Sequence, residues 1–257
     1  MDEKTFRTQV VRSSKDVIAF YSQYAATWDE RFGDKRSTSE FHRIRLESFL
    51  KVAHLKKTDR LVELGVGTGP YLDMISPLVK EIICVDGSKQ MLDILWAKHG
   101  NLPNITLVHM DLEQLIENVS FQADLVYCFG LLEHIIDANN FVKNCRSMLR
   151  TGGRVIFVTA NGRSPWFGVM RQLWRAGRHC SSDRYYTRKQ IDELMGQHGL
   201  APEVAIYWGY CPAGVGDTVY WTLNLIGKIA ERTFLEQYAG GLTVSYVLTD
   251  WAQTAAV

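Results

Sequence analysis

The sequence has no long apolar run and almost no excess of charge of either sign. Its 257 residues include 29 Lys and Arg against 28 Asp and Glu, so the net charge is +1. Such a balance provides no field that would attract a polyanion, which disfavours a nucleic-acid substrate. No run of about eighteen apolar residues occurs, and the charged N-terminus lacks the apolar stretch of a signal peptide. We therefore expect a cytoplasmic protein that contacts a membrane at most peripherally.

Cysteine and histidine lack the spacing of a metal site. The five cysteines contain no Cys-x-x-Cys pair, and three of them fall within apolar or amphipathic runs, as is typical of reduced thiols. The histidines at positions 42, 54, 99, 109, 179 and 198 form no i, i+4 pair. We predict no metal site.

Short apolar runs alternate with helical patterns from about residue 58 onward. Runs of this kind are typical of strands buried on both faces, as in a parallel sheet covered by helices. They are Arg60–Leu64, Ile82–Asp86, Thr106–Met110, Ala123–Phe129 and Arg154–Ala160. Helices are expected between them at Tyr71–Val79, Ser88–Lys98, Glu113–Asn118 and Asn139–Leu149, and a turn at Thr151–Gly153.

Two more strands are expected late in the chain, at 203–208 and Thr243–Thr249, with helices at 187–198 and 218–237. We therefore predict an α/β, Rossmann-like, doubly wound and mostly parallel seven-stranded sheet with an antiparallel edge hairpin. Residues 1–53 are predicted to form a helical N-terminal cap over the ligand edge of this sheet. Ligands bind outside the carboxyl ends of the strands in such folds, so functional residues are expected just after Leu64, Asp86, Met110 and Phe129.

The first of these positions carries a glycine-rich loop. The sequence Glu63-Leu-Gly65-Val-Gly67-Thr-Gly69 lies where a strand ends and a helix begins. Glycines there let backbone N–H groups approach a ligand and let the turn adopt positive φ. The structural alternative is a tight turn that binds nothing.

Acidic residues follow the next two strands. Asp86 ends the second strand, where a carboxylate can accept hydrogen bonds from both hydroxyls of a ribose. Asp111 lies in Met110-Asp111-Leu112 after the third strand, where it can meet an adenine amino group between apolar neighbours. Each carboxylate could instead only cap the following helix. Three such signals at successive strand ends favour a nucleoside site.

Together with the run from Asp124 to Ile135, these motifs resemble the class I S-adenosylmethionine-dependent methyltransferases. The spacing Gly-x-Gly-x-Gly is that of this family, whereas nicotinamide enzymes have Gly-x-Gly-x-x-Gly. The resemblance extends from about Tyr21 to the last strand and implies S-adenosyl-L-methionine as the cofactor. The residues expected to contact it are Tyr21, Trp28, Glu63, Gly65, Gly67, Gly69, Asp86, Gly87, Met91, Met110, Asp111, Leu112 and Phe129.

Within this class the sequence is most similar to O-methyltransferases of ubiquinone biosynthesis, through Leu132-Glu-His-Ile135, Leu149-Arg-Thr-Gly-Gly-Arg154 and Val158-Thr-Ala-Asn-Gly-Arg163. That family usually has Glu where this chain has Gly130, in a segment implicated in metal-assisted catechol methylation. The departure argues against a metal-dependent reaction here.

Two residues are candidates for catalysis. Methyl transfer depends mainly on positioning, and a base helps when the acceptor is a hydroxyl or an ammonium. His134, just after the fourth strand, suits that role at neutral pH, but it could only orient its loop. Glu133 could hold the amino group of the methionine or the loop itself. Tyr21 and Trp28, in a segment resembling the family's cofactor cover, could pack on the sulfonium or only against neighbouring helices.

Residues 163–178 combine an apolar stripe with arginines. Trp166, Met170, Leu173 and Trp174 fall on one helical face, and Arg171, Arg175 and Arg178 flank it. The pattern is typical of a peripheral membrane contact or a lid over an oily substrate, and equally of a core-facing helix with solvated arginines. The helix near Val219–Gln237 could form the other wall of the pocket or a homodimer face.

We interpret residues 1–257 as one methyltransferase domain: a cap (1–53), a cofactor-binding core (54–160), and a substrate lid with edge strands (161–257). The expected reaction is methyl transfer to a small, lipophilic or aromatic metabolite, at oxygen or nitrogen rather than carbon. The alternatives are a protein that retains the cofactor without methylating, and a dinucleotide-dependent oxidoreductase.

Overall fold

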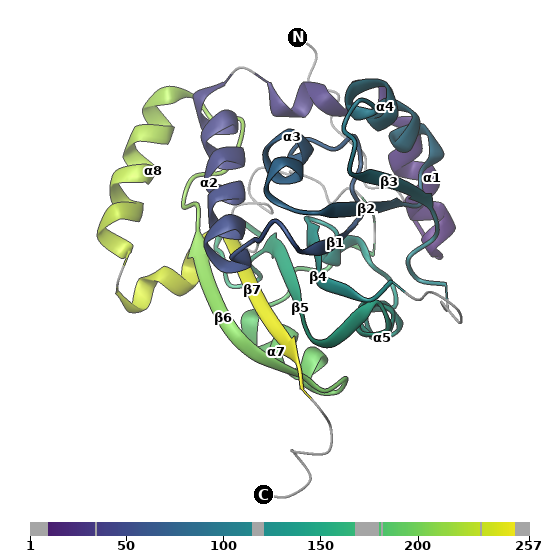
Figure 1. Cartoon of the computed structure of the whole chain (residues 1–257). Helices are drawn as coiled ribbons and strands as arrows, with labels where there is room; N and C mark the ends of the chain where they lie inside the picture. Colours follow the sequence, from purple (N-terminus) through teal and green to yellow (C-terminus); the bar gives the residue numbers. More distant parts are fainter. Residues whose placement is uncertain are drawn as a thin grey trace, which may run out of the picture.

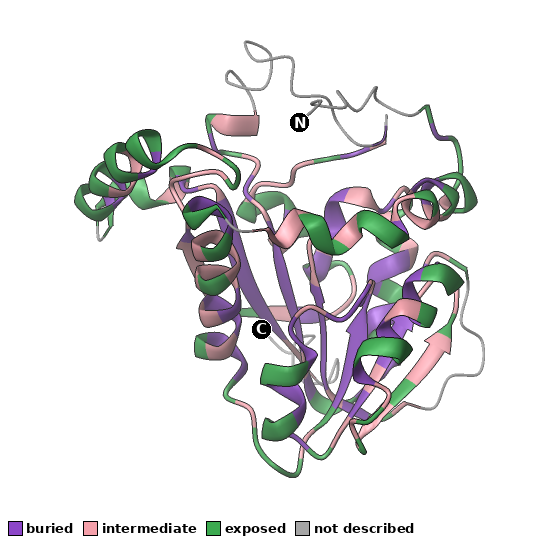
Figure 2. Ribbon diagram, turned by 90° about the horizontal axis from the view of Figure 1, so that it is seen from above, coloured by how far each residue is buried: buried purple, intermediate pink, exposed green. Residues whose placement is uncertain are grey.

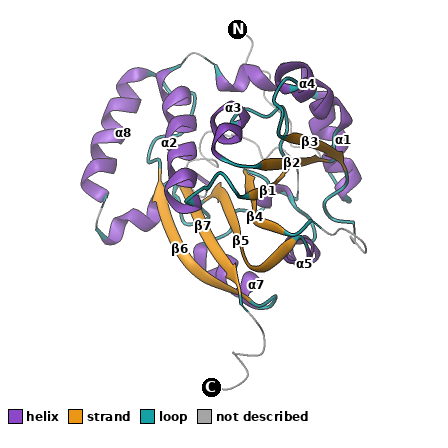
Figure 3. Cartoon of the chain, in the orientation of Figure 1, coloured by secondary structure: helices purple, strands orange, loops and turns teal. Residues whose placement is uncertain are grey.

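The computed structural model shows seven strands with helices between them. It describes residues 10–33, 35–114, 121–167, 180, 182–231 and 233–249. The strands are β1 (Arg60–Leu64), β2 (Glu81–Asp86), β3 (Ile105–His109), β4 (Ala123–Phe129), β5 (Leu149–Ala160), β6 (Leu200–Trp208) and β7 (Gly241–Leu248). Each of the seven runs expected from the sequence overlaps one of them. Figure 1 follows the chain through these elements, and Figure 3 separates strands from helices in the same view.

The strand order β3-β2-β1-β4-β5-β7-β6 confirms the predicted doubly wound sheet. β1 pairs in parallel with both β2 and β4, so the chain winds outward from β1 on one side and from β4 on the other. Only β7 runs antiparallel, and it lies between β5 and β6. A reversal of winding between neighbouring parallel strands leaves a crevice at their carboxyl ends.

Helices cover both faces of the sheet. On one face, α2 (Arg36–Ala53), α3 (Leu72–Ile75) and α4 (Lys89–His99) pack over a core that includes Phe49, Leu95 and Tyr127. On the other, α5 (Ala138–Ser147) and α7 (Arg188–Gly196) pack over Phe141, Phe157 and their neighbours. The buried strands lie between half-exposed helices (Figure 2). Burial on both faces explains why these strands are nearly continuous in apolar residues.

Local signals explain where several helices begin. Ser88 caps α4, since its side chain accepts a hydrogen bond from the Met91 N–H at 3.2 Å. Thr187 and Gln190 form a capping box at the start of α7. Such reciprocal bonds satisfy backbone donors that the first turn of a helix leaves open.

The N-terminal segment is helical, as predicted. It contains α1 (Ser14–Gln23), the 3₁₀ helix η1 (Ala25–Phe32) and α2. A capping box of Ser13 and Asp16 starts α1, and Val17 and Phe20 form its buried face. These two residues pack with Val11 and Cys180, so α1 connects the start of the described chain to a segment much later in the sequence.

Two expectations about local structure are wrong. Thr151–Gly153 do not form a turn after the preceding helix; they lie within β5, where the pairing with β4 shifts register and Gly152 has φ of 71°. The helix expected at 218–237 is interrupted: α8 (Asp217–Ala230) ends where Glu231 turns extended, and the 3₁₀ helix η5 (Phe234–Tyr238) follows. Of the helix expected at Glu113–Asn118, residues 115–118 lie outside the described part of the chain.

The helix α8 stands at the side of the molecule, next to α2 (Figure 1). Its large apolar side chains Val219, Trp221, Leu225, Ile226 and Ile229 are each 45% exposed or more. None of them lines the cavity described below. The acceptor pocket expected between this helix and residues 163–178 involves positions outside the described chain, so that expectation stays a prediction. The role of α8 as a dimer face also stays a prediction.

Candidate functional site

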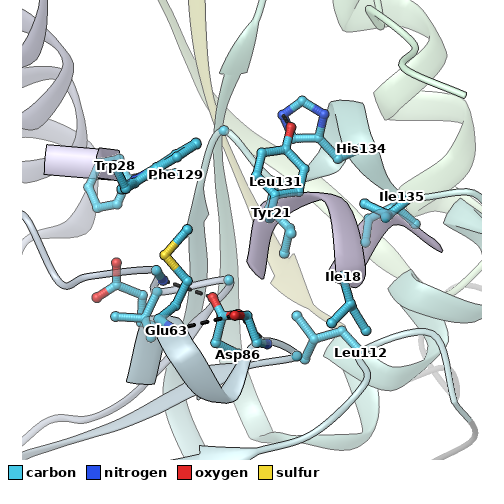
Figure 4. Close-up of a pocket in the computed structure, with 18 of the residues that line it drawn as sticks. Ile18, Tyr21, Trp28, Glu63, Asp86, Leu112, Phe129, Leu131, His134 and Ile135 are labelled. Atoms are coloured by element: carbon cyan, nitrogen blue, oxygen red, sulfur yellow. Dashed lines mark hydrogen bonds between the residues drawn. The ribbon is translucent and has the colours of Figure 1, made fainter. Parts of the chain in front are cut away.

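A cavity lies at the carboxyl ends of the central strands, where the winding of the sheet reverses. It encloses an empty volume of about 1010 Å³, part of it open to solvent. Its floor comes from residues that follow β1, β2, β3 and β4, and residues of α1 and η1 cover it. Figure 4 shows these side chains facing one another across the cavity.

Asp86 links the second strand to the glycine-rich loop. One carboxylate oxygen accepts the Gly67 N–H and the other accepts the Ser88 N–H, both at 2.8 Å (dashed lines in Figure 4). Gly65 and Gly67 have φ of 65° and 58°, which glycine adopts without strain. Burial raises the pKa of Asp86, and the two backbone donors oppose that shift. The loop and the carboxylate thus hold each other beside the cavity.

Glu63, at the end of β1, is almost fully buried at 2% exposure. Burial raises its pKa to about 8, although the Tyr127 hydroxyl donates to the carboxylate at 2.8 Å. The proximity of Asp86 adds to the rise, and Arg45 opposes it. Glu63 therefore places a carboxyl group in the cavity, and a cationic group of a ligand bound beside it would favour its ionised form.

Asp111 follows β3 and is held by the N-terminal helix. Its Oδ2 accepts a hydrogen bond from the Ser14 hydroxyl at 2.6 Å, and its Oδ1 accepts from the Glu113 N–H at 3.1 Å. Leu112, Ile18 and Ile135 line the cavity beside it (Figure 4). A carboxylate flanked by aliphatic side chains can receive the amino edge of a purine while they cover its faces.

Aromatic rings line the other side of the cavity. Tyr21 and Trp28 pack edge to face with centroids 5.5 Å apart, and Phe129 packs 4.5 Å from Tyr71. Figure 4 shows Trp28 and Phe129 facing the space between the strand ends. Ring faces attract cations and pack on flat apolar groups.

His134 connects the cavity to a buried carboxylate. Its Nε2 lies 3.0 Å from the Tyr21 hydroxyl, which points toward the ring in Figure 4, and its Nδ1 lies 2.9 Å from Oδ1 of Asp183. Burial raises the pKa of Tyr21 well above its usual value, so its hydroxyl keeps its proton at neutral pH. Sequence reasoning missed Asp183, which carries no motif and follows residues 168–179, outside the described chain.

Arg45 is a second residue that sequence reasoning missed. Among the described residues that line the cavity, it is the one lysine or arginine. Its guanidinium lies 5.5 Å from the centroid of Phe129 and takes the space next to Gly130. Its position could have been inferred from the sequence, because it lies four residues from both Phe41 and Phe49 and therefore on the apolar face of α2.

Twelve of the predicted residues line this cavity: Tyr21, Trp28, Glu63, Gly65, Gly67, Asp86, Gly87, Met91, Asp111, Leu112, Phe129 and His134. Three others do not. Gly69 faces Leu72, Leu95 and His99, and Met110 packs against the core. Glu133 is buried and accepts a hydrogen bond from the Thr159 hydroxyl at 2.8 Å, so it supports the loop.

Some sequence interpretations concern residues beyond this cavity. Of the segment 163–178, positions 168–178 lie outside the described residues, so the membrane and lid interpretations stay predictions. In its described part, Trp166 donates to the Tyr210 carbonyl at 3.0 Å and Phe167 stacks on Tyr185. No helix in the described ranges is long and apolar enough to span a bilayer. Nor do these ranges bring together three His, Cys, Asp or Glu side chains that could hold a metal.

The fold and the cavity define an α/β protein whose glycine-rich loop and strand-end carboxylates meet at the switch point of its sheet. A family model described as "Methyltransferase domain" matches residues 30–203, more than half of the chain. The chain therefore belongs to the methyltransferase-domain family, which confirms the family inferred from the sequence.

Individual relatives agree with this assignment. A ubiquinone biosynthesis O-methyltransferase of Acinetobacter baumannii (strain ACICU) is 27% identical over 150 residues, which cover 58% of this chain and 63% of that protein. The match thus spans under two thirds of the relative's length.

Solved structures share the fold. The N-methyltransferase NodS of Bradyrhizobium japonicum WM9, in complex with S-adenosyl-L-homocysteine, has a TM-score of 0.62 at 13% identity, covering 91% of this chain and 99% of its own. DhpI in complex with SAH has a TM-score of 0.61 at 19% identity, covering 92% and 97%.

Proposed function

We propose that this chain binds S-adenosyl-L-methionine in the cavity and transfers its methyl group to a small acceptor. The observation that carries the proposal is the convergence of Glu63, Asp86 and Asp111, from three successive strand ends, on one cavity beside a glycine-rich loop. A cationic amino group, a pair of ribose hydroxyls and a purine amino group are the matching donors. Family membership supports the same ligand.

The residues fit the parts of this ligand in order along the cavity. Glu63 and the Gly65–Gly67 loop would hold the amino group and the backbone of the methionine moiety, and Arg45 would pair with its carboxylate. Asp86 would accept both ribose hydroxyls, and Asp111 with Leu112 and Ile18 would receive the adenine. Tyr21 and Trp28 would face the sulfonium, whose charge ring faces attract. When bound, the sulfonium supplies an electrophilic methyl group and a neutral thioether as leaving group.

The acceptor in this proposal is a lipophilic or aromatic metabolite with a reactive hydroxyl. The aromatic side of the cavity suits a flat apolar molecule, and His134 offers a base at its edge. The relatives named as O-methyltransferases support oxygen as the attacking atom. The Tyr21 hydroxyl relays the acceptor proton to Nε2 of His134. Because Tyr21 takes up one proton as it gives up another, it is neutral before and after the transfer.

The first test is a calorimetric titration of the chain with S-adenosylmethionine, S-adenosylhomocysteine and NAD. We expect both sulfur nucleosides to bind and NAD not to, and Asp86→Ala to weaken their binding at least about tenfold, because hydrogen bonds to a charged acceptor contribute about 1.5–3 kcal/mol each. Asp93→Ala is the matched control, since Asp93 pairs with Lys89 on the exposed side of α4. Selective NAD binding, or undiminished affinity of the Asp86 variant, would refute the site.

The second test is transfer of a labelled methyl group to alkyl phenols, alkyl catechols and the corresponding anilines. We expect labelled ethers from the phenolic acceptors. If only the anilines become labelled, the attacking atom is nitrogen and the proposal of oxygen is wrong. Tight nucleoside binding without transfer to any acceptor of the panel would contradict a methyltransferase acting on such compounds and favour a protein that only retains the cofactor.

A further inference from the structure

A buried carboxylate lies behind His134, on the side away from the cavity. The Asp183 side chain has no exposed surface, and its Oδ1 faces Nδ1 of His134 at 2.9 Å. Its other oxygen accepts the Cys180 N–H at 3.1 Å, and the Asp183 N–H donates to the Cys180 carbonyl at 3.2 Å. A local turn therefore fixes the direction of the carboxylate.

The backbone holds Asp183 and His134 in register. The Arg184 N–H donates to the carbonyl of Glu133 at 2.8 Å, so each member of the pair has a sequence neighbour joined to a neighbour of the other. His134 itself ends the short helix η3 (Leu132–His134), and its N–H donates to the Leu131 carbonyl at 2.8 Å. Because backbone hydrogen bonds hold both residues, the fold itself fixes the contact between Nδ1 of His134 and Oδ1 of Asp183.

A carboxylate in this position selects one form of the imidazole. An ionised carboxylate only accepts hydrogen bonds, so the ring nitrogen facing it must carry a proton. In the neutral ring the other nitrogen is then a bare acceptor. That nitrogen is Nε2, which lies 3.0 Å from the Tyr21 hydroxyl at the edge of the cavity. The Tyr21 hydroxyl then donates to it.

We propose that Asp183 is a positioning residue, which keeps the proton of His134 on Nδ1 and presents Nε2 as the base of the methyl-transfer site. The inference rests on the proposed function and adds a residue that does not itself line the cavity. Buried and bonded on both oxygens, Asp183 differs from Asp73, which pairs with Nδ1 of His99 at 3.0 Å but has a side chain that is 71% exposed.

The acceptor oxygen forms a bond to the methyl carbon, and the carbon–sulfur bond breaks with its electron pair remaining on sulfur. The acceptor proton goes to the Tyr21 oxygen as the Tyr21 proton goes to Nε2. The resulting imidazolium is stabilised by the Asp183 carboxylate and later releases its proton to solvent. Asp183 keeps its charge throughout.

The direct test is long-range ¹H–¹⁵N NMR of the histidine side chains in alkaline buffer, with the His134 ring assigned by its loss in His134→Gln. We expect the wild-type ring to carry its proton on Nδ1, and Asp183→Asn to raise the population protonated on Nε2. A wild-type ring protonated on Nε2, or an unchanged ring in a folded Asp183→Asn protein, would overturn the proposal. The wild-type spectrum decides even where the variant does not fold.

Kinetics with an alkyl catechol give the second readout. We expect Asp183→Asn to lower kcat by about 10–100-fold while KM for S-adenosylmethionine changes less than about twofold, because only the base is affected. The control is Asp73→Asn, which breaks a His–Asp contact outside the cavity and should leave kcat unchanged. An unchanged kcat for Asp183→Asn, or equal losses in both variants, would contradict the proposal.

The proposed function and the role of Asp183 can be refuted independently of each other. If S-adenosylhomocysteine does not bind the wild-type chain, the proposed function fails whatever the NMR spectrum shows. If it binds and the His134 proton lies on Nε2, the proposed function stands and the role of Asp183 is refuted.

Discussion

Glu63 illustrates how the fold sets the protonation state of a single side chain. Its pKa of about 8 means that it is mostly protonated at neutral pH in the free protein, because burial disfavours the charged carboxylate. A bound ammonium within a few ångströms favours the charged form and lowers the pKa again. Ligand binding below pH 8 should therefore release a proton.

Proton release is measurable by titrating S-adenosylhomocysteine at pH 7 in two buffers of different ionisation enthalpy. We expect the wild-type chain to release about 0.5–1 proton more than Glu63→Gln, which keeps an acceptor for the Tyr127 hydroxyl but cannot ionise. The release should fade as the pH rises through 8, where Glu63 in the free protein is already ionised. Equal proton release by both proteins would contradict a contact between the ligand's amino group and Glu63.

At the level of single residues, the sequence located the strand-end positions and missed the two that come from elsewhere. Glu63, Asp86 and Asp111 were predictable because parallel strands bring their carboxyl ends together. Arg45 and Asp183 reach the site from a helix and from a loop, so their position depends on how α2 and the segment after Cys180 pack. Gly69 and Met110 were expected at the site because they belong to its motifs, but their local geometry turns them toward the core.

At the level of elements, α1 covers the ligand end of β2 and β3. Ser14 donates to Asp111 at 2.6 Å, and Ser22 donates to the Ser88 hydroxyl at 2.8 Å. Ile18 lies against Gly87, where an added Cβ would come within 2.6 Å of its side chain. These contacts, together with the Tyr21 to His134 hydrogen bond, hold this helix over the proposed nucleoside site.

Removing both hydroxyls should loosen the cover. In Ser14→Ala/Ser22→Ala we expect faster hydrogen exchange of residues 14–23. Affinity for S-adenosylhomocysteine should fall by about 5–150-fold, since two hydrogen bonds of about 0.5–1.5 kcal/mol each are lost.

The control for this experiment is Ser39→Ala. Ser39 donates to the carbonyls of residues 35 and 36, near the start of α2. Unchanged exchange of α1 in the double variant would show that the two hydroxyls do not hold it in place.

The limits of element prediction have physical causes. The existence and type of the strands could be inferred, because burial on both faces leaves a strong compositional trace. The boundaries were less accurate. β5 begins at Leu149 and includes a Gly-Gly pair, because its pairing with β4 shifts register there. The same Gly-Gly pair is typical of a turn, so the sequence indicated a turn at this point. The break after α8 was missed because apolar periodicity continues from Ile229 into Phe234 and Leu235.

At the level of the whole molecule, the sheet order determines where the site lies. The chain leaves β1 toward β2 and β3, and β4 toward β5, so the crevice between β1 and β4 is bordered by residues distant in sequence. This arrangement was predictable from the alternation of strands and helices. The division into cap, core and lid stays a prediction, and within the described residues from 161 onward no side chain lines the cavity.

The most direct test of the central claim is a crystal structure of the chain with S-adenosyl-L-homocysteine. We expect the amino group next to Glu63, the ribose hydroxyls within hydrogen-bond distance of Asp86, and the adenine between Leu112 and Ile18. We also expect the sulfur on the side of Tyr21 and His134. A nucleoside bound elsewhere, or one in the cavity with its ribose away from Asp86, would contradict it.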